Sequence, residues 1–329
     1  MRLRKTVSAF AFLLGTALAT TAVAQEVQLT LGHGTALGNP RDEGAKHFAA
    51  CAAEKSGNRI AVQVAGSAQL GDDAAMITGL RTGSIDMSLN SQGPMAAVVP
   101  EIAALGLPYL FDSPEHAWKV VDGPIGEELA KLADAKGMIL LGFMDNGIRQ
   151  TSNTKHPIEK PADLVGLKIR TPSDPITVAI FEALGANTQQ IKFSELYIAL
   201  QQGVVDGQEN PLMNIYFAKL QEVQPYISLT GHKYETTPFL FSKKKWEQLS
   251  ADDQGIVRGC AKDAIDFQRK LATETEARLL KEMPAQGVKI NEVDRGPFRE
   301  ATQPVIDQAY GSPIGDFARR VVEAAKKAS

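Results

Sequence analysis

The chain has 329 residues, of which 44% are apolar, 22% charged and 6% aromatic. This is enough for one large or two medium globular domains with buried cores, and too apolar for a disordered chain. Lysine and arginine total 35 against 38 acidic residues, so the formal net charge of -3 argues against binding to nucleic acid or to anionic membrane surfaces. Two cysteines exclude a disulfide scaffold and a cysteine-rich zinc module.

Residues 1–24 are predicted to be a cleaved signal peptide. Basic residues from Arg2 to Lys5 precede an apolar run that is short for a membrane span, and Ala22 to Ala24 has the small residues of a cleavage site. No later stretch has about 20 consecutive apolar residues. We therefore expect a periplasmic protein without direct membrane insertion, with a retained anchor helix as the alternative.

From residue 26 onward, segments with strand-like alternation are followed by segments with helical spacing, which predicts an α/β fold. In the periplasm, Cys51 and Cys260 would lie in an oxidising compartment. They could form one disulfide bridge or remain two separate buried thiols, and the sequence leaves both alternatives open. Expected strands are 27–31, 60–64, 85–89, 138–143 and 164–170, and expected helices are 42–55, 72–81, 127–135, 177–184, 194–202 and 251–283.

One spacing pattern, Leu-x-x-Gly-x-x-Asp-x-x-x-Asn, occurs twice and ends at Asn90 and at Asn210. In each copy a glycine stops a helix, and a short strand then ends at the asparagine. Ligands of open α/β sheets bind beyond the carboxyl ends of strands. The repeat therefore predicts two similar lobes that face a shared cleft, with coincidence of common residues as the alternative.

The familiar catalytic and cofactor motifs are missing from the sequence. The run Gly32 to Gly38 follows a predicted strand, but it has one residue too many for a dinucleotide-binding loop, and Pro40 interrupts the helix start. The five histidines are scattered without the spacing of metal ligands. We therefore expect no cofactor, no metal and no enzymatic activity.

Two arginines follow predicted strands. In GLKIRTP, residues 166–172, Arg170 lies near the carboxyl end of a strand that Pro172 ends. A guanidinium there can bind a carboxylate through two parallel, charge-assisted hydrogen bonds, although a solvent-exposed strand charge is the alternative. Arg149 follows the strand 138–143 and could contact the same ligand or only pair with an acid such as Asp145 or Glu209.

Several motifs occur in the order found in the DctP-type solute-binding proteins of TRAP transporters. They are AQLGDDAAM at 68–76, NGIRQTSN at 146–153, GLKIRTP at 166–172 and FSELYIALQQGVVDGQENP at 193–211. The chain resembles this family from about residue 29 to beyond residue 270. The resemblance implies a two-lobed periplasmic-binding-protein fold, with a hinge and a long helix that spans both lobes. It divides the chain into domain I, residues 25–147 and 236–275, and domain II, residues 148–235 and 276–329.

The resemblance also implies a receptor that binds a small organic acid between its domains and delivers it to the membrane permease subunits of a TRAP transporter. We expect a monomer. A receptor for a sensor kinase and a periplasmic enzyme on the same scaffold are the alternatives. By position in the family motifs, the carboxylate would bind Arg170, the second arginine would be Arg149, Asn210 would help, and Phe193 would form an aromatic wall.

The remaining candidates come mainly from the first domain, around its strand ends and the N-terminus of a helix. Sialic-acid-binding members carry asparagine, glutamate and arginine where this chain has Gly34, Ser91 and Pro94, so sialic acid is not expected. Neutral hydrogen-bonding groups there favour a sugar acid over a C4-dicarboxylate. These candidates are Asp73, Asn90, Ser91 and Gln92, with His33, Asn39, Arg41, Tyr234 and Pro172 at the pocket or its rim.

Overall fold

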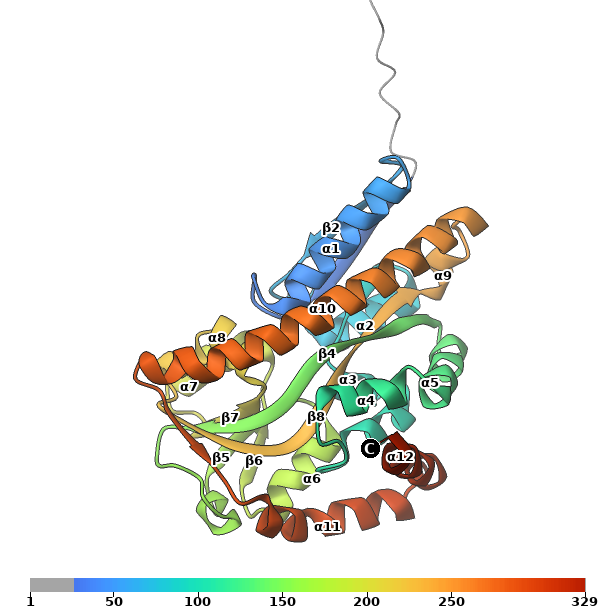
Figure 1. Ribbon diagram of the computed structural model, residues 1–329. Coiled ribbons are helices and arrows are strands. Elements are labelled where there is room, and N and C mark those ends of the chain that lie inside the picture. The colour runs from blue at the N-terminus through green and yellow to red at the C-terminus, as the bar shows by residue number, and fades with distance from the viewer. Residues whose placement is uncertain (1–26, 329) are drawn as a thin grey trace, which may run out of the picture.

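The computed structural model describes residues 27–328, and the predicted signal peptide lies outside this range. Its centre is one sheet with the strand order β2-β1-β3-β8-β4-β7-β5-β6, and β9 pairs with β8. The longest strands, β4 (Met138–Asn153) and β8 (Tyr226–Ser242), run antiparallel through its middle (Figure 1). Each is about three times the usual strand length, so both cross from one half of the sheet to the other.

Each half of the sheet is a parallel α/β unit, which we call a lobe. The expected alternation of strands and helices is confirmed in both. The first lobe contains β1 (Val27–His33), β2 (Ile60–Ala65) and β3 (Met87–Leu89), with α1 (Pro40–Lys55) and α2 (Asp73–Thr82). The second lobe contains β5 (Lys168–Thr171), β6 (Asn187–Gln190) and β7 (Gly207–Asn210), with α6 (Pro175–Ala183), α7 (Phe193–Gln201) and α8 (Leu212–Phe217).

The repeated spacing pattern builds the same unit in both lobes. The glycine after α2 and the glycine after α7 both have positive φ, 82° and 69°, a conformation that favours glycine. The aspartate that follows anchors the neighbouring parallel strand: Asp86 accepts a hydrogen bond from the backbone N–H of Thr30 at 2.8 Å, and Asp206 accepts one from Lys168 at 2.9 Å. Asn90 and Asn210 therefore lie at equivalent strand ends.

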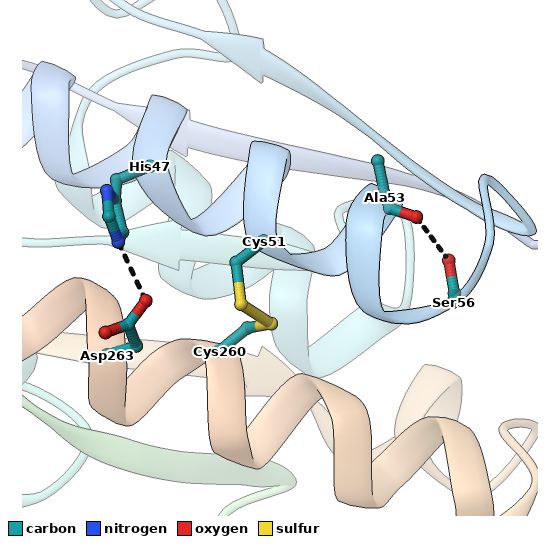
Figure 2. The surroundings of a disulfide bond; sticks show 6 residues. All are labelled: His47, Cys51, Ala53, Ser56, Cys260 and Asp263. Carbon is teal, nitrogen blue, oxygen red and sulfur yellow. Dashed lines mark hydrogen bonds and ion pairs between the residues drawn. A yellow bond between two sulfur atoms is a disulfide. The ribbon is translucent and has the colours of Figure 1, made fainter.

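The long helix α10 (Ala251–Ala285) has 35 residues and runs diagonally over both lobes (Figure 1). It contacts α1 in the first lobe and α8 in the second, which confirms the predicted helix that spans both. A disulfide joins Cys51 of α1 to Cys260 of α10, the pairing that the sequence left open (Figure 2). One turn before Cys51, His47 pairs with Asp263 at 2.8 Å. No helix within residues 27–328 has both the length and the apolarity to cross a bilayer.

The C-terminal helices pack across the predicted domain division. The helix α12, in the predicted domain II, contacts α4, α5 and the 3-10 helix η1, which the prediction assigned to domain I. The predicted boundaries at 147/148, 235/236 and 275/276 fall inside β4, β8 and α10, so both lobes share these elements.

The remaining elements are α3 (Gln92–Met95), η1 (Pro100–Gly106), α4 (Pro114–Val121), α5 (Pro124–Ala135), η2 (Pro161–Leu164), η3 (Leu220–Glu222), α9 (Lys243–Trp246), β9 (Lys289–Glu292), α11 (Arg295–Gly311) and α12 (Gly315–Ala328).

Candidate ligand-binding site

A cavity lies between the lobes, where the carboxyl ends of the parallel strands meet the N-termini of α1, α2 and α7. Strand ends supply Thr35 and Ser91 from the first lobe, and Arg170 and Asn210 from the second. This is the place where open α/β sheets bind ligands. Helix N-termini also favour negatively charged groups, because their backbone N–H groups lack partners within the helix.

Arg170 is a buried cation without an ion-pair partner. It is 3% exposed, and its Nε donates to the carbonyl oxygen of Ile191 at 2.8 Å. Its Cζ lies 6.0 Å from the centre of the Phe193 ring. Within the described part of the chain, no carboxylate pairs with it and its Nη1 and Nη2 make no hydrogen bond. Burial opposes the charged form and lowers its pKa from the usual 12.5 to about 10. The Nη1 and Nη2 groups of Arg170 are therefore available to an anionic ligand.

Arg149, in contrast, is held by carboxylates. It forms ion pairs with Glu209 on β7 and with Glu235 on β8, and its Nη2 also donates to the Asn210 side-chain oxygen at 3.2 Å. Burial opposes its charge, but the two carboxylates outweigh burial and raise the pKa of Arg149. The side chain lines the cavity, yet most of its hydrogen-bond donors are used to hold β4, β7 and β8 together. Its main role in this geometry is support.

A third arginine, Arg41, enters the cavity from the second residue of α1. It is 2% exposed, and its Nη2 donates to Asn146 at 2.9 Å and to Thr237 at 2.8 Å. Both partners are uncharged, and no carboxylate of the described residues forms an ion pair with it. Burial lowers its pKa, while the nearby Asp73 acts in the opposite direction. Arg41 is therefore a second buried guanidinium with donors to spare.

Asp73, the first residue of α2, is the acidic side chain of the first-lobe wall. Its carboxylate accepts from the backbone N–H of Ser91 at 3.2 Å and from the side-chain amide of Asn90 at 3.3 Å. Burial raises the pKa of Asp73 more than Arg41 and Ser91 lower it. The first-lobe part of the cavity thus presents an acceptor, Asp73, near a donor, Arg41.

The sequence model of one protein family, described as "Bacterial extracellular solute-binding protein, family 7" (DctP), matches residues 31–312 of this chain. The chain belongs to this family. The resemblance noted in the sequence is thereby confirmed. Solved relatives of this DctP-family protein superpose on it over nearly their whole length, which confirms the predicted fold. The family and these relatives are binding proteins rather than enzymes.

Three relatives illustrate the range of the family. An uncharacterised protein of Sinorhizobium fredii is 51% identical over 87% of this chain, and the match covers only 53% of that relative's own length. The 2,3-diketo-L-gulonate-binding periplasmic protein of Escherichia coli is 33% identical over 92% of both chains. The sugar acid binding protein of Advenella mimigardefordensis, solved with galactonate, is 35% identical, covers 93% of this chain and 99% of its own, and superposes with a TM-score of 0.91.

The structure brings most of the predicted site residues of this DctP-family protein to one cavity. Asn210 there donates to Gln208 at 2.6 Å and accepts from Asn214 at 3.2 Å. No metal-binding cluster is found among residues 27–328. The predicted residues that line the cavity are Arg170, Arg149, Asn210, Phe193, Asp73, Ser91, Pro172 and Arg41.

The other predicted residues do not line the cavity. Asn90 supports Asp73, as described above. Gln92 is 1% exposed and accepts from both the backbone and the hydroxyl of Thr236. Asn39 caps α1 and donates to Asn214 at 3.1 Å. His33 is fully buried. These side chains lie one layer behind the cavity wall.

Tyr234 lies outside the cavity because of strand geometry. Neighbouring residues of a strand face opposite sides of the sheet, and Glu235 takes the side of the cavity. The Tyr234 hydroxyl consequently lies on the opposite face, where it donates to Asp145 at 2.7 Å and accepts from the Trp118 indole at 3.1 Å. The expectation that Tyr234 stands at the pocket rim is not supported by this placement.

Sequence reasoning missed Thr35, Asn214 and Glu235, which all line the cavity. Asn214 lies one helical turn after Asn210, so the helix that follows β7 could have indicated it. Glu235 lies on β8, a strand that the sequence analysis did not predict at all. Its polar side chains are buried on both faces of the sheet, so the strand shows no apolar alternation.

Proposed function

We propose that this DctP-family protein binds a hydroxylated monocarboxylic acid of the sugar-acid class between its lobes. The ligand carboxylate binds the two free amino groups of Arg170 through parallel hydrogen bonds, and the Asn210 amide adds a further donor. The observation that carries this proposal is the buried Arg170 guanidinium without a carboxylate partner. A buried unpaired charge is costly, and a bound carboxylate compensates that cost.

The first-lobe wall supports a hydroxylated ligand over a dicarboxylate. Arg149 is already neutralised by Glu209 and Glu235, so it supplies no second cationic site. Arg41 has free donors, but Asp73 shares its part of the cavity. A second ligand carboxylate would be repelled by Asp73, whereas a hydroxyl can donate to Asp73 and accept from Arg41. The galactonate and diketogulonate named for two relatives belong to the same chemical class.

Ligand binding would stabilise the closed arrangement of the lobes. Asp72 of the first lobe pairs with Lys192 of the second at 2.9 Å at the cavity wall, and the Asn39–Asn214 hydrogen bond also joins the lobes. A ligand that contacts Arg170 and Asp73 together binds this arrangement more tightly than an open one. Closure is then a population shift driven by differential affinity.

The transport role places this receptor outside the cytoplasm. The predicted signal peptide would direct it to the periplasm, where it acts as a monomer and passes its ligand to the membrane permease of a TRAP transporter. The extracellular description of the family and the periplasmic name of the Escherichia coli relative support this role.

Isothermal titration calorimetry with D-galactonate, D-galacturonate, D-glucuronate and succinate tests the proposal. We expect at least one sugar acid to bind more tightly than succinate, and Arg170→Ala to weaken that binding by roughly 100-fold or more, since a bidentate charged contact is lost. Arg320→Ala removes a half-exposed arginine of α12 and serves as the control. Unchanged affinity in Arg170→Ala, or no binding of any sugar acid by the wild-type protein, would contradict the proposal.

A further inference from the structure

Three side chains form a hydrogen-bonded chain that runs from the first lobe's interior to the cavity. Asp42 Oδ1 lies 3.1 Å from His33 Nε2, and His33 Nδ1 lies 3.0 Å from Thr35 Oγ1. Asp42 and His33 are fully buried, and Thr35 is 4% exposed. Thr35 is the member that lines the ligand cavity. The order is acid, imidazole, hydroxyl, with Thr35 at the cavity.

The surroundings of Asp42 decide where the imidazole proton lies. Its other oxygen accepts from the backbone N–H of Gly38 at 2.7 Å and from the Lys46 ammonium at 2.8 Å. Burial raises the pKa of Asp42, but the hydrogen bonds from His33, Lys46 and Gly38 outweigh burial and lower it. Asp42 is therefore a carboxylate that can only accept, so His33 Nε2 carries a hydrogen.

Burial bears on the other ring nitrogen. Lys46 is half-exposed and pairs with both Asp42 and Glu43, whereas His33 is fully buried between Asp42 and Thr35. Because burial opposes the charged form of an imidazole, we take His33 to be neutral. A neutral imidazole with its hydrogen on Nε2 has a lone pair on Nδ1. The Thr35 hydroxyl must then donate to Nδ1, and only the lone pairs of its oxygen remain for a ligand.

We propose that the Asp42–His33 pair engages the Thr35 hydroxyl hydrogen, so that Thr35 can only accept a hydrogen bond from a ligand. Thr35 thereby selects a ligand hydroxyl over a ligand carboxylate. This inference rests on the proposed function and names the specificity determinant of the same site. Thr35 and Asp73 line the same cavity, and a Cβ placed on Gly34, the residue before Thr35, would lie 3.6 Å from Asp73 Oδ1. Both acceptors reject an anionic group at this wall. Thr35 contacts the ligand, and His33 and Asp42 are positioning residues.

Affinity measurements on two Thr35 variants test the contact. Thr35→Val keeps the shape but removes the acceptor, so we expect affinity for the sugar acid that the wild type binds best to fall about 5- to 10-fold. Succinate affinity should stay the same or rise. Thr35→Ser keeps the hydroxyl and should behave like the wild type. Equal loss for both acids, or no loss at all, would overturn the inference.

The proton position is tested directly by NMR of the 15N-labelled imidazoles, with His33→Gln used to assign the His33 signals. We expect a hydrogen on Nε2 and none on Nδ1; the reverse tautomer would overturn the inference. In Asp42→Asn the side-chain amide can donate to Nε2, which moves the ring hydrogen to Nδ1. Galactonate affinity should then fall, with no further loss on adding Thr35→Val. If the wild type binds a sugar acid and Thr35→Val leaves that affinity unchanged, this inference alone is overturned. If the wild type binds no sugar acid, the proposed function is overturned.

Discussion

Replacement of Arg170 by methionine should stabilise the ligand-free protein while it abolishes binding. The pKa of Arg170 is lowered from 12.5 to about 10 because the folded protein buries its charge without a carboxylate partner. A base whose pKa falls on folding destabilises the fold at every pH below the folded value. The penalty is therefore complete at pH 7 and disappears only as the pH rises from about 10 towards 12.5.

The size of the effect follows from the same shift. A lowering of about 2.5 pKa units corresponds to about 3 kcal/mol at 1.36 kcal/mol per unit, and the side chain is too buried for solvent to screen it. Methionine also loses the hydrogen bond to Ile191, worth about 1 kcal/mol, and a distant contact with the Phe193 ring worth less than about 1 kcal/mol. The free energy of unfolding should rise by about 1–2 kcal/mol.

Urea unfolding of the ligand-free proteins at pH 7 measures this difference. Arg170→Lys is the matched control, because lysine keeps a buried cation and should not be stabilised. A melting temperature a few degrees above wild type in Arg170→Met, without any shift on adding a sugar acid, would agree with the reasoning. If Arg170→Met instead unfolds more easily than wild type by 1 kcal/mol or more, the guanidinium is a structural partner and not a charge kept for a ligand.

Two further predictions concern the links between elements. The Cys51→Ser/Cys260→Ser double variant should lose about 5 kcal/mol of unfolding free energy, because the bridge closes a loop of 209 residues. Wild-type protein treated with reductant should match the double variant in urea titrations, and an equal unfolding midpoint with and without reductant would refute this. Lys192→Ala removes the exposed pair with Asp72 between the lobes, so stopped-flow dissociation of the ligand should become roughly 2- to 5-fold faster and less salt-dependent. A dissociation rate that does not change would show that this pair does not hold the lobes.

Regular amphipathic elements and their stop signals could be predicted from the sequence. The helix expected at 251–283 is α10, and the glycines that end α2 and α7 are where the repeat placed them. The strand-end rule predicted that Arg170 and Asn210 face a shared cleft, and both side chains line the cavity between the lobes. These features depend on local spacing and on the general geometry of parallel sheets, which the sequence contains.

The parts that escaped prediction depend on partners far along the chain. The role of Arg149 is set by Glu235, 86 residues away on β8. That strand has buried polar side chains on both faces and is stabilised by pairing with β4, so its residues lack the alternation that identifies a strand. Because β8 was not predicted, the sequence did not indicate that Tyr234 faces α4 while Glu235 faces the cavity.

The most direct test of the central claim is a crystal structure of the protein grown with the sugar acid that binds most tightly in calorimetry. The account predicts both carboxylate oxygens about 3 Å from the Arg170 amino groups, with ligand hydroxyls against Thr35 and Asp73. A carboxylate bound to Arg41, with Arg170 still bonded only to Ile191, would contradict it.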